Sequence, residues 1–105
     1  MKKFIIILSL LFTATINAQN ITVVQFNAKW NSHNTNDNVE KIKRADYKFA
    51  YLENQSPALQ QSIKAVPTVV VYKDGKPVGV FEGDLTMTLR VRLEDIQAVV
   101  DKHID

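Results

Sequence analysis

The sequence predicts an α/β domain with the element order β-α-β-α-β-β-α, in which helices flank a mixed four-stranded sheet. Three observations favour this fold class. Two short runs, 21–26 and 67–72, are rich in β-branched apolar residues, which is typical of buried strands. A helix-start signal, Ser56-Pro57, stands between them, and a two-residue turn signal, Asp74-Gly75, follows the second run. Strands that alternate with helices pair in parallel, whereas a hairpin adds antiparallel pairing.

The first 18 residues are set apart from this fold by their own pattern. Lys2 and Lys3 form a positive head, an apolar run extends over 4–12, and Ala18 offers a small residue for cleavage. This order is that of a secretory signal peptide, and the apolar run is shorter than the roughly 20 residues that a membrane-spanning helix needs. We therefore expect a signal peptide at 1–18, a domain at 19–105 and a periplasmic or secreted location. An N-terminal membrane anchor that is retained is the alternative.

Composition and charge restrict the chemistry of the domain. The 105 residues of the chain include no cysteine, which excludes disulfides, thiolate nucleophiles, iron–sulfur clusters and cysteine-based zinc sites. The two histidines, His33 and His103, are too few for an imidazole metal cage. Signal cleavage would remove Lys2 and Lys3 from the 13 basic residues and leave 11, against 11 acidic ones. Since no basic excess remains, we expect no nucleic-acid partner. We also expect no membrane contact after cleavage, and no metal or other cofactor.

The first half of the predicted domain contains two strands with a helix between them. Residues 21–26, Ile-Thr-Val-Val-Gln-Phe, form the first strand. Asp37 and Glu40 have capping-box spacing, which predicts a short helix that ends at about Arg44. Residues 47–53 follow as the second strand.

The second half adds a helix, a hairpin and a final helix. Ser56 caps the helix that begins at Pro57. The strongest strand of the sequence is 67–72, and the Asp74-Gly75 turn joins it to a strand at 78–82. The last helix is predicted at 93–104 because its apolar residues recur at helical spacing, namely at Leu93, Ile96, Val99, Val100 and Ile104.

Residues 85–93 alternate strictly between apolar side chains and Thr or Arg. Such alternation predicts a half-buried strand or an extended arm. Two interpretations stay open: a strand or connector that lies over the core, and an exposed sheet edge that pairs with another chain, because unpaired edges invite strand addition. The predicted edge interface consists of Leu85, Met87, Leu89 and Val91.

Three motifs resemble the thioredoxin family, and they occur in the family's order. Residues 23–30, Val-Val-Gln-Phe-Asn-Ala-Lys-Trp, resemble the strand that leads into its Trp-Cys-x-x-Cys site. Residues 66–68, Val-Pro-Thr, resemble its cis-proline loop, and 73–76 with 81–83 resemble its final hairpin and the glycine that follows. The resemblance covers about residues 21–104. It implies a trimmed thioredoxin-like fold that lacks the family's usual first strand and helix.

The resemblance also implies that the family's redox centre has been lost. The four positions of the Cys-x-x-Cys site are occupied by Asn31, Ser32, His33 and Asn34, and the position of the family's buried acid by Gln25. Disulfide exchange needs an attacking thiolate and a resolving thiol, and asparagine supplies neither. We therefore expect a redox-inactive domain with no catalytic residues.

The family's substrate groove implies what such a domain does instead. Trp30, Val66, Pro67 and Gly83 correspond to groove residues, and in the family the backbone before the cis-proline pairs with an extended peptide. We expect a binding or structural module that takes a protein or an extended peptide here. Two alternatives stay open: an accessory subunit of a larger secreted or surface assembly, and an enzyme of unrelated chemistry centred on His33, the one titratable side chain of the site loop.

Overall fold

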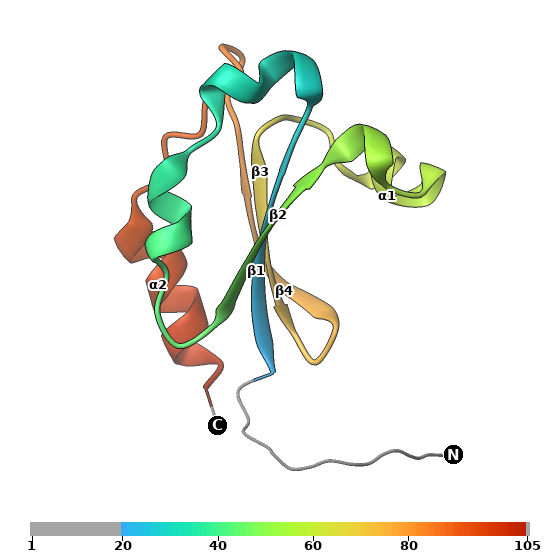
Figure 1. Cartoon of the computed structure of the whole chain (residues 1–105). Helices are drawn as coiled ribbons and strands as arrows, with labels where there is room; N and C mark the ends of the chain where they lie inside the picture. Colours follow the sequence, from blue (N-terminus) through green and yellow to red (C-terminus); the bar gives the residue numbers. More distant parts are fainter. Residues whose placement is uncertain (1–19, 105) are drawn as a thin grey trace, which may run out of the picture.

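A four-stranded sheet carries helices on both of its sides in the computed structural model, which describes residues 20–104 (Figure 1). The predicted signal peptide at 1–18 lies outside the described residues. The elements follow one another as β1 (Ile21–Asn27), η2 (Lys29–Asn34), η3 (Asp37–Lys41), β2 (Asp46–Tyr51), η4 (Leu52–Asn54), α1 (Pro57–Ser62), β3 (Thr68–Lys73), β4 (Lys76–Glu82) and α2 (Leu93–Lys102), where η denotes a 3-10 helix.

The strand order in the sheet is β2-β1-β3-β4. β1 runs parallel to β2 and antiparallel to β3, and β4 completes the sheet as the antiparallel partner of β3. Asp74 and Gly75 both adopt positive φ angles, 53° and 82°, as a two-residue hairpin turn between twisted strands requires. The mixed four-stranded sheet and its hairpin, both predicted from the sequence, are confirmed.

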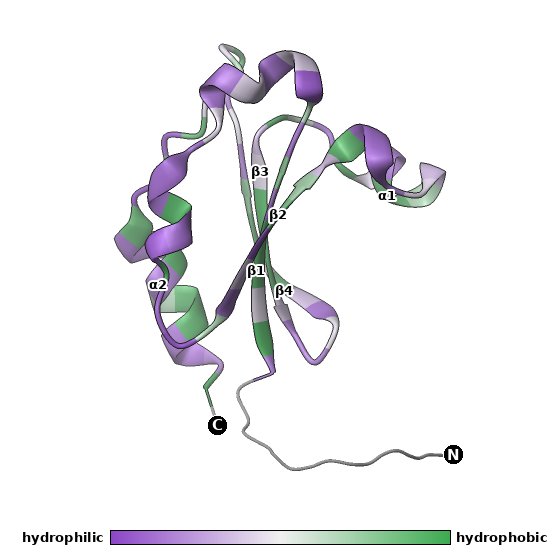
Figure 2. Cartoon of the chain, viewed as in Figure 1, coloured by the Kyte–Doolittle hydropathy of each residue, from purple (hydrophilic) through white to green (hydrophobic). Residues whose placement is uncertain are grey.

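One face of the sheet builds the main hydrophobic core. Alternate residues of β1 and β3 point to this face, where η3, α2 and the segment before α2 cover them (Figure 1). Figure 2 shows hydrophobic residues along β1 and β3 and on α2. The buried residues of this core are Ile21, Val23, Val39, Ile42, Val69, Val71, Leu89, Ile96 and Val100.

The helices differ from the prediction mainly between β1 and β2. The helix expected from Asp37 to about Arg44 is the short 3-10 helix η3, and Asn36 caps it by accepting a hydrogen bond from the backbone N–H of Asn38. The start of α1 is confirmed, since the Ser56 hydroxyl accepts from a backbone N–H one turn later. Among residues 20–104, no helix is long and apolar enough to cross a membrane.

Residues 85–92 form no strand, so of the expected strand or extended connector only the connector that lies over the core is present. The segment forms a loop with a turn at its start, and Met87 adopts a φ of 62°, which is incompatible with a strand. The apolar residues of the loop divide between two environments rather than sharing one strand face. Leu85 is fully exposed and Met87 is partly exposed, whereas Leu89 is buried in the core and Val91 packs against it. The predicted edge interface therefore does not exist as a strand.

Candidate functional site

The two positions that correspond to the thioredoxin cysteines are joined by a hydrogen bond between amides. Both lie in η2, directly after β1. Asn34 donates from Nδ2 to Oδ1 of Asn31 over 2.8 Å. Asn31 is only 1% exposed, and its own Nδ2 donates to Oδ1 of Asn27 and to the backbone carbonyl of Met87, each over 3.0 Å. Asn31 therefore links the site loop to a segment 56 residues later in the chain.

Asn27, the last residue of β1, is fully buried and uses both ends of its amide. Its Nδ2 donates to the carbonyl of Asn31 and to the Thr35 hydroxyl, while its Oδ1 accepts from the backbone N–H of Ala28. A buried polar side chain is stabilising only when its hydrogen bonds are made, and those of Asn27 are made. Asn27 is not among the residues predicted from the sequence, although a polar residue at the end of a buried strand is a signal of a structural hydrogen-bonding role.

Gln25 fixes the other end of the loop. It is fully buried, its Nε2 donates to the carbonyl of Asn36 and to the Tyr47 hydroxyl, and its Oε1 accepts from the N–H of Asn36. An ionised carboxylate could not make the two donated bonds, so an amide suits this position better than an acid does. Asn36 in turn donates from Nδ2 to the carbonyl of Leu89. We call Gln25, Asn27, Asn31, Asn34 and Asn36 the amide network.

His33 and Ser32 project outward from the same loop. Both are exposed, and within residues 20–104 the His33 side chain takes part in no hydrogen bond or ion pair. A general base needs a group that orients it and a nucleophile within reach. Over the same residues, no three His, Cys, Asp or Glu side chains gather in a way that could hold a metal ion. The described part of the loop thus offers no constellation for catalysis.

A pocket of about 460 Å³ opens beside this loop, and we call it the Trp30 pocket. It brings Trp30 and Val66, two of the predicted groove residues, together with Leu85 and Met87, which the sequence analysis had placed on a separate surface. Trp30 is 62% exposed and Leu85 is 100% exposed. The pocket is lined by Ala28, Trp30, Leu52, Glu53, Gln60, Ile63, Lys64, Ala65, Val66, Asp84, Leu85 and Met87.

Pro67 and Gly83, the other two predicted groove residues, are not among the residues that line the Trp30 pocket. The Val66–Pro67 peptide bond is cis, Pro67 is buried, and the N–H of Gly83 donates to the Pro67 carbonyl over 2.7 Å. A Cβ on Gly83 would lie 2.6 Å from the Val66 carbonyl oxygen, so this position has no room for a side chain. The backbone N–H and C=O of Val66 itself make no hydrogen bond within residues 20–104.

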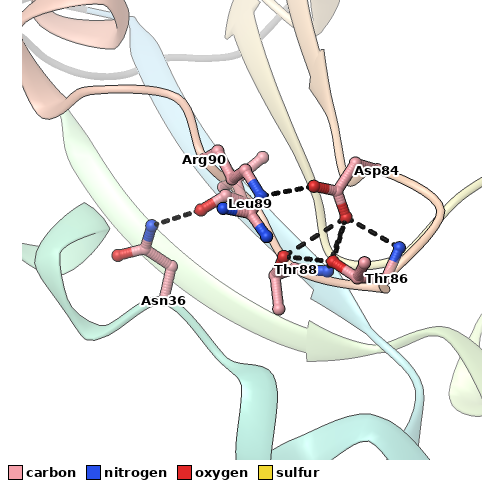
Figure 3. A network of polar contacts seen from close by, with 6 residues as sticks. All are labelled: Asn36, Asp84, Thr86, Thr88, Leu89 and Arg90. Carbon is pink, nitrogen blue, oxygen red and sulfur yellow. Dashed lines mark hydrogen bonds and ion pairs between the residues drawn. The ribbon is translucent and has the colours of Figure 1, made fainter.

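The loop that carries Leu85 is held by the Asp84 carboxylate (Figure 3). Its Oδ1 accepts from the N–H and hydroxyl of Thr86 and from the hydroxyl of Thr88, and its Oδ2 accepts from Nε of Arg90. The Thr86 hydroxyl and, second, the Arg90 guanidinium hold the pKa of Asp84 far below its ordinary value. Because Asn31 and Asn36 bind the carbonyls of Met87 and Leu89, the same loop is also fastened to the amide network.

Comparison with known proteins supports one conclusion about the fold. No protein-family model and no curated protein matches the sequence. Among solved structures, a mutant thioredoxin from Halobacterium salinarum NRC-1 superposes with a TM-score of 0.63 at 18% identity, over 83% of this chain and 77% of that one. Thioredoxin-2, described as a component of the malaria parasite protein secretion machinery, gives a TM-score of 0.58 at 23% identity over 86% and 89%. The chain has the thioredoxin fold.

A third thioredoxin, that of Schistosoma mansoni, agrees, with a TM-score of 0.58 at 18% identity over 82% of this chain and 79% of that one. Identities this low establish the thioredoxin fold alone, so the predicted fold class is confirmed and peptide binding stays a prediction. Within this fold, the sequence contains no cysteine at the site, and the amide network fills the loop in which the family carries its thiols. Leu52, Ile63 and Ala65 of the Trp30 pocket could not be found from the sequence, because only folding brings the segments at 52 and 63–65 to Trp30.

Proposed function

We propose that this thioredoxin-like domain is a redox-inactive, secreted or periplasmic module that binds an extended peptide or protein segment in the Trp30 pocket. One observation carries the proposal: Val66, a buried residue whose backbone is unpaired within residues 20–104, lines the same pocket as the exposed residues Trp30, Leu85 and Met87. An accessory subunit of a larger assembly would use the same surface, with a folded neighbour in place of a free peptide.

Peptide recognition by strand addition needs a free backbone and nearby pockets for side chains. Val66 supplies a backbone N–H and C=O that bind nothing within residues 20–104. Trp30 and Leu85 supply exposed apolar surface in the same pocket, and tryptophan is among the residues whose truncation most often costs about 2 kcal/mol or more at an interface. The pocket therefore combines main-chain pairing with apolar anchors.

The site loop lacks the groups that thiol–disulfide exchange needs. Exchange with a disulfide requires a thiolate, and the chain contains no cysteine. The Asn34 amide donates to Asn31, and the Asn31 amide donates to Asn27 and to the Met87 carbonyl, which makes both residues structural. The loop thus holds Trp30 at the pocket, and this geometry supports binding.

Trp30 provides a direct assay because it is the only tryptophan of the chain. A randomised eight-residue peptide library displayed on phage is selected against the purified domain, and the recovered peptide is synthesised and titrated. We expect Trp30 emission to shift to shorter wavelength as the peptide covers the indole ring. Leu85→Ser should weaken binding about tenfold or more, the loss of one well-placed apolar anchor.

The matched control is Val80→Ser, which removes another exposed apolar side chain, 54% exposed, from β4 and outside the pocket. Circular dichroism should show both variants folded as wild type, since neither side chain is buried. Selection of no peptide, or equal affinity for wild type and Leu85→Ser, would contradict the proposal.

A further inference from the structure

β2 forms one edge of the sheet and carries a row of aromatic side chains. Tyr47, Phe49 and Tyr51 are alternate residues of this strand, so they lie on one face; we call them the aromatic row. Phe49 is 38% exposed, and its ring meets that of Tyr51 edge to face with centroids 5.0 Å apart. β2 pairs with β1 alone, and within the described residues the backbone of 46–50 makes no hydrogen bond outside that ladder.

Two carboxylates stand beside the aromatic row. Asp37 and Glu40 project from η3, and with the row they line an open hollow of about 280 Å³. Within residues 20–104, neither carboxylate takes part in a hydrogen bond or an ion pair. Both carboxylates act electrostatically on the aromatic row: burial raises the pKa of Tyr47, and the negative charges of Glu40 and Asp37 raise it further. The hollow therefore has a local negative charge that no ion pair within the described residues balances.

One ring of the row already faces a cation. Nζ of Lys29 lies 5.9 Å from the centroid of Tyr51, within the range of a cation–π interaction. Tyr47 and Phe49, by contrast, share the hollow with the carboxylates of Asp37 and Glu40. Aromatic faces beside carboxylates are the surroundings that lysine and arginine side chains prefer.

We propose that the β2 edge, the aromatic row and the carboxylates of Asp37 and Glu40 form a second docking surface, which takes an extended basic segment of a partner as an added strand. The open edge offers backbone pairing, and alternate side chains of the added strand project to the same face as the row. Lysine or arginine at every second position meets the two carboxylates and the exposed ring of Phe49. This surface shares no lining residue with the Trp30 pocket.

The test measures fluorescence anisotropy at low salt with a labelled seven-residue peptide in which threonine and lysine alternate. A matched peptide has glutamate in place of lysine, and a third carries N-methyl groups on alternate backbone amides. We expect the lysine peptide to bind, the glutamate peptide not to bind, and the N-methylated peptide to bind at least about tenfold more weakly, because methylation blocks strand pairing. Failure of the lysine peptide to bind, or equal binding of either control peptide, would overturn the proposal.

Variants of the protein locate the contact. Asp37→Asn with Glu40→Gln should weaken binding of the lysine peptide about tenfold or more. Phe49→Thr should weaken it as well, and threonine, being β-branched, still suits a strand. The control, Glu82→Gln with Glu94→Gln, makes the same change in net charge on β4 and α2 and should leave affinity within about twofold.

Equal loss in this control would show only a nonspecific attraction of charges and would overturn the proposal. Leu85→Ser should leave the lysine peptide bound, whereas loss of binding in that variant would place the peptide in the Trp30 pocket instead. The proposal for the β2 edge and the proposal for the Trp30 pocket can thus be refuted independently.

Discussion

Replacing Asn31 by alanine should destabilise the fold far more than its place in a surface loop suggests. Asn31 is buried and makes three side-chain hydrogen bonds, to Asn27, Asn34 and the carbonyl of Met87. Alanine removes all three and leaves the Met87 carbonyl without this donor.

The magnitude follows from the two bonds that Asn31 donates. A buried hydrogen bond contributes about 0.5–1.5 kcal/mol net, and an orphaned buried acceptor costs about 1–3 kcal/mol. The Asn27 oxygen still accepts from Ala28, and the half-buried amide of Asn34 can be hydrated, so their losses are small. Most of the loss therefore comes from the part-buried bond to the Met87 carbonyl, and we expect Asn31→Ala to lower the free energy of unfolding by about 1–3 kcal/mol.

Urea unfolding followed by circular dichroism measures this loss. With an m value of about 1 kcal/mol per M, typical of a small domain, a loss of about 2 kcal/mol moves the midpoint by about 2 M. Asn34→Ala should cost less than about 1 kcal/mol, and Ser32→Ala, at an exposed neighbour, should cost close to nothing. A loss below about 0.5 kcal/mol for Asn31→Ala, or one no larger than that of Asn34→Ala, would refute the structural role of the amide network.

Three further outcomes follow from the same structure. Asn31→Cys with Asn34→Cys should give at most weak insulin reduction in a turbidity assay, because the first thiol would be as buried as Asn31 and Gln25 cannot accept a proton. Gly83→Ala should lower the melting temperature more than Gly79→Ala, since its Cβ would meet backbone oxygen at 2.6 Å rather than the movable tip of a valine side chain. The carboxyl carbon of Asp84, followed by NMR, should titrate well below the ordinary aspartate pKa. Because this pKa is depressed in the folded state, the contribution of Asp84 is present at neutral pH and is lost only as the pH falls through the lowered pKa.

Each of these outcomes has a result that would count against its premise. Insulin reduction by the double cysteine variant at a rate like that of a thioredoxin would mean that the loop remains competent for exchange. Equal melting temperatures for the two glycine variants would mean that the Val66 backbone yields freely. An ordinary pKa for Asp84 would mean that the 84–90 loop is not held by its carboxylate in solution.

The sheet was predictable because its signals are local. The β-branched runs of β1 and β3, the Ser56-Pro57 helix start and the Asp74-Gly75 turn each act over a few residues, and the structure contains all of them. The loop at 84–90 was misread because alternation of apolar residues is also compatible with a turn. The overlooked signal was Asp84 followed by Thr86 and Thr88, whose side chains and backbone satisfy one carboxylate.

The site could be predicted only in part, since its contacts join distant segments. The motifs at 23–30 and 66–68 indicated that Trp30 and Val66 belong to one surface, and both line the Trp30 pocket. That Leu85 belongs to it as well depends on the bond from Asn31 to the carbonyl of Met87, across 56 residues of sequence. Periodicity and spacing contain no information about such a contact, because it is set by where the folded sheet places the two loops.

Amide hydrogen exchange at Val66 tests the proposed peptide binding most directly. Val66 is 9% exposed and lines the Trp30 pocket, and its N–H has no acceptor within residues 20–104. When the peptide selected on phage is added at saturating concentration, exchange at Val66 should slow by about tenfold or more, while exchange in the turn at Asp74-Gly75 stays unchanged. A saturated complex in which Val66 exchanges as fast as in the free domain would contradict strand addition at this site.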